Sequence, residues 1–488
     1  MGIWRPPNHR NGAPGGEDHR IDGTRSRLGG MRPALSIKPP SFLLGTCLLL
    51  LSSSCGQPDG RPLYLTDAQG REMVLHGVNV SGAAKSDPLG LAWHTKADYA
   101  RLAGWGFNTV RLLLFWSVLE PTQGQYNSVY MDSIEERLDW AEAHGLMVIL
   151  DMHQDLYSAE FTGDGAPAWA INSDGHRFSP LSPWWLNYVH PAVLAAFDHL
   201  WTDAWLQDAY ADAWGHVASH LGSHSAVIGY DLMNEPFLAT QSPLTFEGDR
   251  LRPFYHLVAQ SIRVHDPNAR IFFEPMAFPT ASGAPSLMPA YGDPQAAYAP
   301  HYYDPIVHEG GPYHGSAAIV DAAMALKASE AEDHGVPMIL GEFGAFDGGP
   351  GHLDYLEDLM NALDQHACGW AYWSYDKGGG FGLLDGNGDE TAVFDVIVRA
   401  YPQRVAGTIQ EHSFDLSTRV MELRYETPSP IAAPTEIFVP AARLYPGGFQ
   451  VSSSDAAGSW SWTFDQAREV VQIVHDTGQN SHTIRIEP

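Results

Sequence analysis

Short apolar runs alternate with longer amphipathic segments between about residues 61 and 400. The apolar runs predict strands at 74–80, 107–116, 146–153, 226–236, 269–276, 296–304, 336–344 and 369–376. Segments with helical periodicity follow most of them, near 96–106, 130–145, 208–222, 254–265, 316–334, 352–366 and 391–400. Near-continuous apolar strands separated by helices indicate a parallel sheet covered by those helices.

Eight strand units, most of them followed by a helix, predict an α/β fold, a (β/α)₈ TIM barrel. An open doubly wound sheet is the alternative. No glycine-rich phosphate loop follows the first predicted strand, which disfavours that alternative.

The pattern changes after about residue 401, where short alternating strands are separated by turn residues. This texture predicts a small C-terminal β-sandwich. We therefore expect three regions: an N-terminal extension and signal peptide over 1–58, the catalytic barrel over 59–402, and the sandwich over 403–488.

The N-terminal region contains the apolar run "FLLGTCLLLLSSSCGQ", which has the length of a signal peptide. Met31 is a more ordinary start for such a segment than Met1. The Ser-Ser-Ser-Cys sequence ending at Cys55 resembles a bacterial lipoprotein cleavage site. We expect a secreted or extracellular protein, with lipid anchoring at Cys55 as an open alternative.

Composition narrows the range of partners. The chain carries 57 acidic and 28 basic residues, for a formal net charge of −29. Such a surface repels polyphosphate, so we expect no nucleic-acid partner. Fifteen Trp and twenty Tyr suit sugar rings and lipid interfaces, although aromatic residues also fill ordinary cores. Two of the three cysteines lie in the leader, so no internal disulfide is expected in the body.

Polar side chains gather where the predicted barrel strands end. In a barrel of this kind the active site lies at the carboxyl ends of the strands. The strand ends carry Arg111, Trp116, Asp151, His153, Asp155, Asn234, Glu235, Glu274, His301, Tyr303, Glu342 and Trp373. The apolar part of each strand then belongs to the barrel, and its polar end belongs to the mouth.

Two of these residues, Glu235 in "YDLMNEPF" and Glu342 in "MILGEFGAF", end strands of the same shape. A pair of carboxyl groups is what glycoside hydrolysis requires, with a separation of about 5–5.5 Å in retaining enzymes. Asn234 can hydrogen-bond the sugar 2-hydroxyl beside the acid. We expect the negative charge of Glu342 to raise the pKa of Glu235.

The sequences "NEP" and "GEFG" resemble glycoside hydrolase family 5, the cellulase-like retaining enzymes. The motifs "SGAAKSDP", "LDMHQDLYS", "GAPAWA", "PHYYDP" and "AYWSYD" are similar to its endoglycoceramidase branch. The resemblance covers roughly residues 60–488. It implies hydrolysis of the β-glycosidic bond between oligosaccharide and ceramide in glycosphingolipids. A sister group resembles endogalactosylceramidases, and the choice between the two stays open.

The resemblance also implies residue roles. Glu235 matches the acid/base and Glu342 the nucleophile. The implied substrate-binding residues are Lys85, Arg111, His153, Asp155, Asn234, His301, Tyr303 and Trp373, with Lys85 and Asp155 on the glycan side. No cofactor and no metal are implied. We expect a monomer that meets its glycosphingolipid substrate at a membrane surface.

Some features depart from the family pattern or remain open. Glu274 in "FFEP" mimics the context of Glu235 without an Asn, which favours a supporting role. Asp151, His153 and Asp155 alternate on one strand end, so metal ligation is an alternative there. The insertion over about 158–190 is too long for an ordinary loop. Its Trp169, Trp184 and Trp185 either line a groove for acyl chains or pack the loop onto the barrel.

Two further hypotheses concern the function as a whole. One is an endo-β-glucanase that acts on polysaccharide with the same scaffold. The other is a non-catalytic lectin or surface lipoprotein, which the presence of both glutamates disfavours. The lipid hypothesis adds that Phe237 and the insertion wall an apolar channel, with the sandwich beside the rim of that channel.

Overall fold

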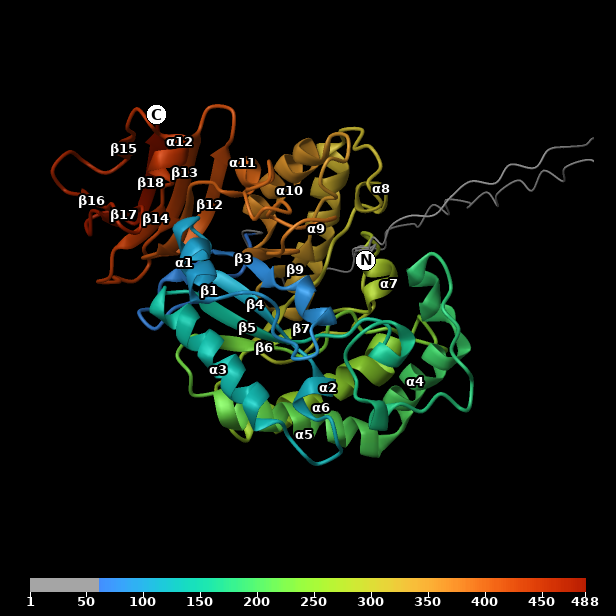
Figure 1. Ribbon diagram of the computed structural model, residues 1–488. Coiled ribbons are helices and arrows are strands. Elements are labelled where there is room, and N and C mark those ends of the chain that lie inside the picture. Colours follow the sequence, from blue (N-terminus) through green and yellow to red (C-terminus); the bar gives the residue numbers. More distant parts are fainter. Residues whose placement is uncertain (1–60) are drawn as a thin grey trace, which may run out of the picture. The chain divides into compact units, whose positions relative to one another are not determined.

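The computed structural model describes residues 61–488 (Figure 1). Its central sheet has eight parallel strands in the order β8-β7-β6-β5-β4-β3-β10-β9. The strands are β3 (Leu75–Val80), β4 (Thr109–Leu114), β5 (Met147–Met152), β6 (Val227–Asp231), β7 (Ile271–Phe273), β8 (Ala296–Tyr298), β9 (Ile339–Phe343) and β10 (Gly369–Tyr372). Parallel bridges between Tyr298 and Met338 and between His301 and Glu342 join β8 to β9 and close the barrel. The predicted TIM barrel is confirmed.

Helices cover the outside of the sheet between successive strands. The long ones are α1 (Lys96–Gly104), α3 (Ser128–Ala143), α4 (Pro191–Thr202), α5 (Ala204–Leu221), α6 (Arg252–Arg263), α9 (Ala317–His334) and α10 (His352–His366). The segment between β7 and β8 holds only the short α7 (Ala277–Thr280). The other short α-helices of the barrel are α2 (Trp116–Leu119), α8 (Pro305–His308) and α11 (Phe394–Ile397).

Local sequence sets the helix ends. The side chain of Asn127 accepts the N–H of Tyr130 at 3.1 Å and caps the start of α3. The carboxylate of Asp98 accepts the N–H of Thr95 at 2.8 Å at the start of α1. Gly335 takes a left-handed conformation directly after α9, where a side chain would be strained. These signals make the helices start and stop so that each strand returns to the same end of the barrel.

The C-terminal region forms two antiparallel sheets, which confirms the predicted sandwich. One sheet has the order β12-β13-β18-β15 and the other the order β1-β2-β11-β14-β17-β16. The strands are β1 (Leu65–Thr66), β2 (Glu72–Met73), β11 (Tyr401–Val405), β12 (Thr408–Asp415), β13 (Val420–Glu426), β14 (Thr435–Phe438), β15 (Gln450–Ser453), β16 (Ser461–Asp465), β17 (Val470–Val474) and β18 (Ser481–Glu487). The short α12 (Ala441–Leu444) follows β14. The second sheet thus includes two strands that precede the barrel.

The sandwich packs against the amino ends of the barrel strands. The N–H of Val74, just before β3, donates to the carbonyl of Gln403. The hydroxyl of Tyr401 donates to the carbonyl of Gly106, just before β4, at 2.7 Å. The catalytic mouth lies at the carboxyl ends of the same strands. The expectation that the sandwich lies beside the mouth is therefore wrong, because β2 pairs with β11 and fixes the sandwich to the opposite end of the barrel.

The expected signal peptide and Cys55 lie outside the described residues. Within the described part, no helix combines the length and apolar character needed to span a bilayer. Cys368 is buried and has a free thiol.

We predict that Gly106→Ala destabilises the protein by disturbing this junction. Gly106 has φ of +85°, and an added Cβ would lie 2.1 Å from the ring of Phe438. Such overpacking costs roughly 1–3 kcal/mol. Gly124→Ala is the matched control, because Gly124 has φ of +73° and open space around it. Chemical denaturation should show a larger loss for Gly106→Ala, and equal losses would contradict the packing explanation.

Candidate active site

The two glutamates predicted to act together meet in the mouth of the barrel. Glu235 follows β6 and is 7% exposed, whereas Glu342 belongs to β9 and is 5% exposed. One oxygen of each carboxyl group lies within 4.8 Å of the other. Inverting glycosidases hold their carboxyl groups about 6.5–9.5 Å apart to admit a water molecule. The observed approach fits direct attack by one carboxylate.

Arg111 of β4 holds this arrangement from below. All five of its N–H groups donate hydrogen bonds, over distances of 2.8–3.1 Å. The acceptors are Asp231, Asn79, Glu342, Asn234 and Glu274. The predicted substrate-binding residue therefore has no N–H left for substrate, and it positions the nucleophile instead.

The nucleophile is fixed at both oxygens. Arg111 donates to Glu342 Oε1 at 2.8 Å, and the hydroxyl of Tyr303 donates to Oε2 at 3.0 Å. Burial first, then the charge of Glu342, raises the pKa of Tyr303 well above its usual range. Tyr303 thus stays a neutral donor to the carboxylate. The Glu342 carboxylate can rotate little without losing its charge-assisted hydrogen bond to Arg111.

Asn234 and His153 lie beside the pair, and both are buried. Asn234 accepts a bond from Arg111 and donates to the carbonyl of Gln154 at 3.1 Å, which leaves one amide hydrogen for a sugar hydroxyl. His153 Nδ1 contacts Asp151 at 2.7 Å, while its Nε2 has no partner among the described residues. Burial lowers the pKa of His153, so a neutral imidazole can offer Nε2 to a hydroxyl.

His301 bridges the carboxylates of the mouth. Its Nδ1 lies 3.1 Å from Glu235 and 3.7 Å from Glu342, and its Nε2 lies 3.2 Å from Glu274. The Nε2 contact has ion-pair distance without hydrogen-bond alignment. Burial would lower the pKa of His301, but the charges of Glu274 and Glu342 and the bonded Glu235 raise it well above 6.5. His301 is therefore positively charged.

This charge reverses the expected pKa shift of the acid. Burial would raise the pKa of Glu235, but the hydrogen bond and charge of His301 lower it to about 2. The expectation of a raised pKa is wrong for the free site, because the hydrogen bond and positive charge of His301, 3.1 Å from Glu235, outweigh the effect of burial. The mobile proton of the pair rests on His301, one hydrogen bond from Glu235.

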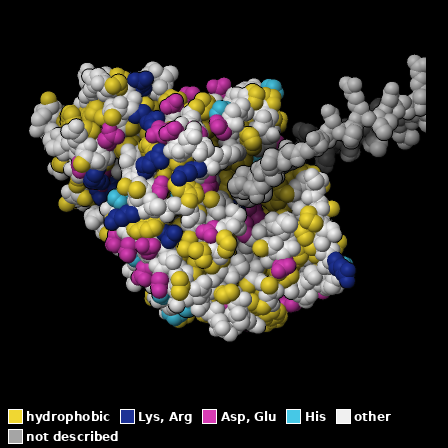
Figure 2. All heavy atoms as spheres, viewed as in Figure 1, with side chains coloured by type: hydrophobic (Ala, Val, Ile, Leu, Met, Phe, Trp, Pro, Cys, Tyr) yellow, Lys and Arg dark blue, Asp and Glu magenta, His cyan; other side chains and the backbone are white. Residues whose placement is uncertain are grey.

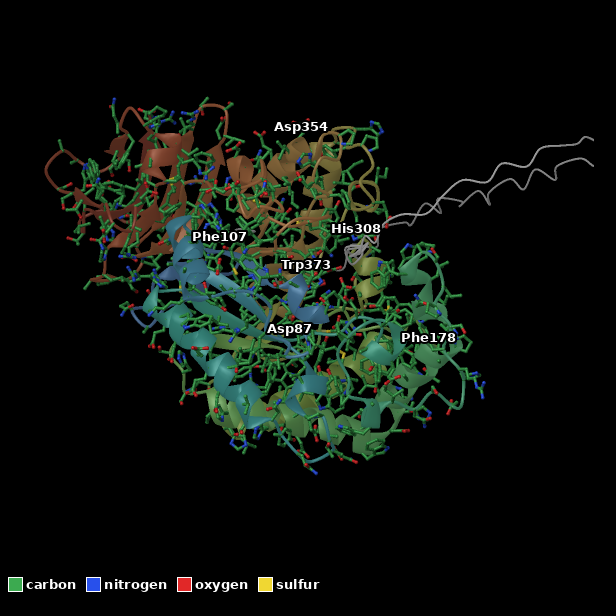
Figure 3. The ribbon with its side chains drawn as sticks, in the orientation of Figure 1. Asp87, Phe107, Phe178, His308, Asp354 and Trp373 are labelled. Atoms are coloured by element: carbon green, nitrogen blue, oxygen red, sulfur yellow. The ribbon has the colours of Figure 1, made fainter. Side chains whose placement is uncertain are left out.

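Lys85, Asp155 and Trp373 form one side of the mouth. Lys85 Nζ lies 2.5 Å from Asp155 and 4.2 Å from the centre of the Trp373 ring. The Trp373 and His153 rings stack at 5.5 Å. In Figure 3, Trp373 lies near the centre of the molecule, between Asp87 and His308. The flat ring and the charged groups beside it offer a stacking face and hydrogen-bond donors to a sugar.

The three tryptophans of the insertion do not behave alike. Trp169 donates from its indole N–H to the carbonyl of Glu120 at 2.8 Å and packs on the core. Trp184 also packs on the core, next to Tyr188. Trp185 is 41% exposed. Phe237 is 7% exposed and packs against Tyr188 at 4.9 Å. The packing explanation therefore fits Trp169 and Trp184, and only Trp185 is free to meet a lipid.

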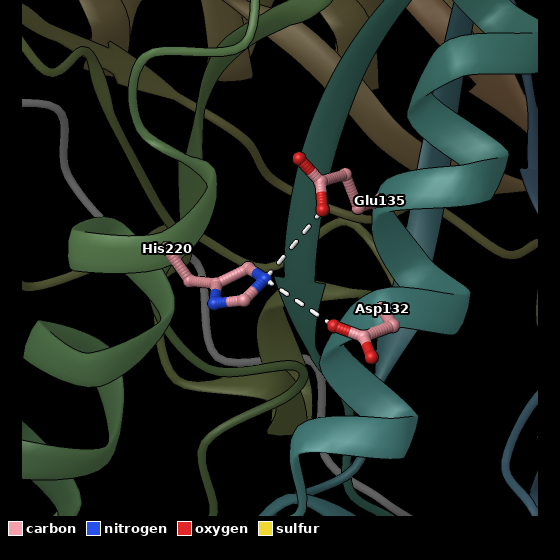
Figure 4. Close-up of side chains that lie close together, drawn as sticks. All are labelled: Asp132, Glu135 and His220. Atoms are coloured by element: carbon pink, nitrogen blue, oxygen red, sulfur yellow. Dashed lines mark ion pairs between the residues drawn. The ribbon is translucent and has the colours of Figure 1, made fainter.

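Four groups of His, Asp and Glu in the described part come close enough to share a cation. On the outer helices, His220 of α5 lies 3.9 Å from Asp132 and 3.6 Å from Glu135 of α3 (Figure 4). A similar group joins Asp139 and Glu142, farther along α3, to the partly buried His224, which follows α5. The contacts of His220 and His224 are ion pairs near solvent, where such pairs contribute little.

The other two groups lie in the mouth, where protein cations already compensate the charge. Lys85 pairs with Asp155 of the group formed by His153, Asp155 and Asp164. Arg111 and His301 neutralise the group formed by Glu235, His301 and Glu342. Asp151 of the alternative metal site belongs to neither group and contacts His153 and Arg111 instead.

Three residues that organise the site escaped sequence reasoning. Asn79 of β3 donates to the carbonyl of Gly341 at 3.1 Å, beside the nucleophile. Asp231 of β6 accepts from Arg111, and Gln154 donates to the carbonyls of Asn234 and Glu235. The available signal was a polar residue inside an apolar strand, as in "HGVNV" and "IGYDL". Burying such a group requires a hydrogen-bonded partner.

The family comparison covers both regions of the fold. Residues 66–379 match the family described as "Cellulase (glycosyl hydrolase family 5)". Residues 399–486 match the family described as "Glycoside hydrolase family 5 C-terminal domain".

Relatives and solved structures agree with this match. Endoglycoceramidase I of Rhodococcus hoagii is 30% identical over 415 residues, which are 81% of each chain. Endoglycoceramidase of Cyanea nozakii is 29% identical over 74% of this chain and 79% of its own. The structure of endo-glycoceramidase II from Rhodococcus sp. in its ganglioside GM3 complex has a TM-score of 0.80 and 35% identity, over 88% of this chain and 99% of that one. The chain therefore belongs to glycoside hydrolase family 5, and it is a glycoside hydrolase.

Proposed function

We propose that this enzyme hydrolyses the β-glycosidic bond between an oligosaccharide and ceramide in glycosphingolipids, with retention of configuration. The observation that carries the proposal is the buried pair Glu235 and Glu342, in a chain that matches a ganglioside-bound endo-glycoceramidase over 88% of its length. The pair supplies the reaction, and the likeness supplies the substrate class.

In the first step, Glu342 attacks the anomeric carbon while Glu235 gives a proton to the departing ceramide oxygen. The bond to ceramide breaks and a glycosyl ester forms on Glu342. Arg111 and Tyr303 aim the attacking carboxylate by holding both of its oxygens. In the second step, Glu235 takes a proton from water, which attacks the same carbon and releases the sugar with its original configuration.

His301 supports both steps. It holds a proton 3.1 Å from Glu235, and Glu235 passes that proton on as the leaving oxygen gains charge. Once Glu342 is esterified, His301 loses one of the negative charges that raise its pKa. The proton balance between His301 and Glu235 thus changes during the cycle, as an acid that later becomes a base requires.

The glycan side lies along Lys85. A cavity of about 420 Å³ opens between the segment after β3, the segment after β4 and the insertion. It is lined by both polar and apolar groups, including Lys85, Pro88, Phe115, Asn127 and Asp164. Such a mixed lining suits sugars beyond the one that stacks on Trp373. A polysaccharide endoglucanase would need a comparable cleft on the opposite, leaving-group side as well.

The lipid side involves the insertion and the loops after β8 and β9. Exposed apolar side chains there are Leu181, Trp185, Val189, Ile306 and Phe346. Loops that follow parallel strands leave the same end of the barrel, so these side chains surround one mouth. We propose that they contact the membrane that holds the substrate. The protein's strong negative charge opposes binding to anionic lipid, so apolar contact must supply the attraction.

Charged side chains are unevenly distributed over one face of the protein. On the face in Figure 2, Lys and Arg side chains gather at the upper left, over the C-terminal sheets and adjoining helices. The lower right shows mostly uncharged and hydrophobic side chains, over helices α4, α5 and α6. A face of low charge loses less hydration when it approaches a bilayer.

Export and anchoring complete the proposal. The apolar run before Cys55 supports secretion, and the Ser-Ser-Ser-Cys sequence supports lipidation at Cys55. A monomer anchored in this way would meet glycolipid in the plane of a membrane. If a Cys55→Ser variant stayed in the membrane fraction as fully as the natural chain, anchoring at Cys55 would be wrong.

A substrate panel tests the function. Lactosylceramide, ganglioside GM3, galactosylceramide and carboxymethylcellulose should be compared with detergent present, and products should be separated as intact glycan and intact ceramide. We expect turnover of the first two and none of cellulose. Hydrolysis of carboxymethylcellulose without glycolipid turnover would favour the endoglucanase. Turnover of galactosylceramide alone would favour the endogalactosylceramidase subgroup; a solved endogalactoceramidase structure shares the fold at 24% identity.

Glu235→Gln should separate the two chemical steps. The 2,4-dinitrophenolate group of an aryl lactoside departs without a proton, so the rate of the first step on this substrate should be largely kept. The rate of natural glycolipid hydrolysis should fall about 10²–10⁴-fold. The glycosyl-enzyme should then accumulate, because no base activates water, and added azide should restore turnover. Glu342→Gln is the control, since it should abolish hydrolysis of both substrates. Equal collapse on both substrates in Glu235→Gln would refute the acid role.

Trp185→Ala should weaken hydrolysis of glycolipid embedded in vesicles by roughly tenfold, equivalent to ~1.4 kcal/mol of lost apolar contact. Hydrolysis of a soluble aryl lactoside should stay unchanged. Trp462→Ala is the matched control, because Trp462 is similarly exposed at 39% but belongs to the sandwich at the opposite end of the barrel. The membrane proposal fails if both variants lose the same activity on vesicles. It also fails if Trp185→Ala loses the same activity on both substrates.

A further inference from the structure

Glu274 is a third buried glutamate of the mouth, and the two-carboxylate reaction does not use it. It follows β7 and is 2% exposed. One of its oxygens accepts the backbone N–H of Glu235 at 2.8 Å, and the other accepts from Arg111 at 3.0 Å. His301 Nε2 lies 3.2 Å from that second oxygen. One carboxylate thus contacts the acid's backbone, the cation below it and the imidazole beside it.

The backbone of Glu235 needs this support. Glu235 has φ of +43°, in the left-handed region that residues other than glycine rarely adopt. Such a conformation costs of order 1–3 kcal/mol and persists only when neighbours hold it. Glu274 holds the N–H of Glu235, and Gln154 holds its carbonyl at 3.0 Å. Together they fix the direction in which the acid's side chain leaves the strand.

The charge of Glu274 acts on the same acid through His301. The imidazole lies between two carboxylates, with Nδ1 toward Glu235 and Nε2 toward Glu274. Burial raises the pKa of Glu274 to about 7, against the lowering effect of His301. The anion of Glu274 in turn is the largest contribution that raises the pKa of His301. Glu274 therefore helps to keep a proton on the pair formed by His301 and Glu235.

Several other charged groups lie close to Glu274. Arg111 of β4 binds the carboxylate of Glu274, and the charges of Asp231 of β6 and Asp151 of β5 act on it. Glu235, which follows β6, donates its backbone N–H to it, and Glu342 of β9 shares its partners Arg111 and His301. The hydroxyl of Tyr255 of α6 donates to the Glu274 carbonyl at 3.1 Å. Among these groups, His301 is the only cation besides Arg111 that the described residues place against the carboxylate.

We propose that Glu274 is a positioning residue for the acid/base: it fixes the strained backbone of Glu235 and holds the charged His301 against it. This inference rests on the proposed glycosidase reaction and does not depend on the lipid part of the substrate. The proposal also explains why "FFEP" departs from the family pattern. Its carboxylate positions the glutamate of "NEP", which follows the neighbouring strand.

Glu274→Gln tests the charge with little change of size. Two lactosides should be compared by kcat/KM, an aryl lactoside with the good leaving group 2,4-dinitrophenolate and an alkyl lactoside with a poor leaving group. The poor substrate should lose about 100-fold, because its departure needs the acid, and the good one should lose only a few-fold. The alkaline limb of the pH profile should move to lower pH, because the proton shared by His301 and Glu235 loses a stabilising anion.

Glu247→Gln is the matched control. Glu247 is also a buried carboxylate near β7, but it binds the backbone N–H of Met276 and the hydroxyl of Ser286 rather than the catalytic residues. Glu247→Gln should change kcat/KM equally for both leaving groups and leave the alkaline limb of the pH profile in place. Equal losses on both substrates with an unmoved limb in Glu274→Gln would overturn the proposal and leave Glu274 a merely structural role.

Glu274→Asp decides the matter if Glu274→Gln does not fold. It keeps the charge but withdraws the carboxylate by one methylene from the Glu235 N–H. The alkaline limb should then stay in place while the loss remains specific to the poor leaving group, and activity equal to the natural enzyme would contradict the proposal. Absence of any aryl lactoside turnover in the natural enzyme would instead refute the proposed function itself.

Discussion

The guanidinium of Arg111 carries a permanent charge and is buried. All five of its N–H groups donate hydrogen bonds to side chains of the mouth. Removing one partner of such a buried pair typically costs about 3–5 kcal/mol, because the other charge is left uncompensated. The carboxylates therefore cannot turn away from Arg111 without a large loss of stability. This single constraint sets the position of the nucleophile and of the groups around it.

The same constraint governs protonation. Five buried carboxyl groups, Asp151, Asp231, Glu235, Glu274 and Glu342, share the mouth with the cations Arg111 and His301. Full ionisation would leave excess negative charge in a region of low dielectric, which is costly. Burial accordingly raises the pKa of Asp151 and of Glu274. The mouth holds protons near the glycosidic bond because its negative charge exceeds its positive charge.

Sequence patterns predicted the barrel, the sandwich and the strand-end location of Glu235 and Glu342, because period and strand ends are local properties. The contact between Glu274 and the N–H of Glu235 was not predictable, since it depends on how β6 and β7 pair. Arg111 was assigned to the substrate because sequence does not reveal how many of its donors the protein itself uses.

Two other expectations failed for the same kind of reason. The sequence suggests only Glu342 as a neighbour of Glu235, whereas His301, 66 positions away, lowers the pKa of Glu235 against the effect of burial. The sandwich was expected beside the rim of the mouth to help present the site to a bilayer, whereas β2 and β11 pair across more than 300 residues and fix it at the opposite end. Long-range pairing leaves no periodic trace in a single sequence.

The central claim is that Glu235 and Glu342 act as a double-displacement pair. Proton NMR of the sugar released from an aryl β-lactoside tests it directly, if the anomeric signals are recorded before mutarotation. The account predicts that the β-anomer forms first and the α-anomer grows in slowly. Initial formation of the α-anomer would contradict it, because a single displacement by water inverts the anomeric carbon.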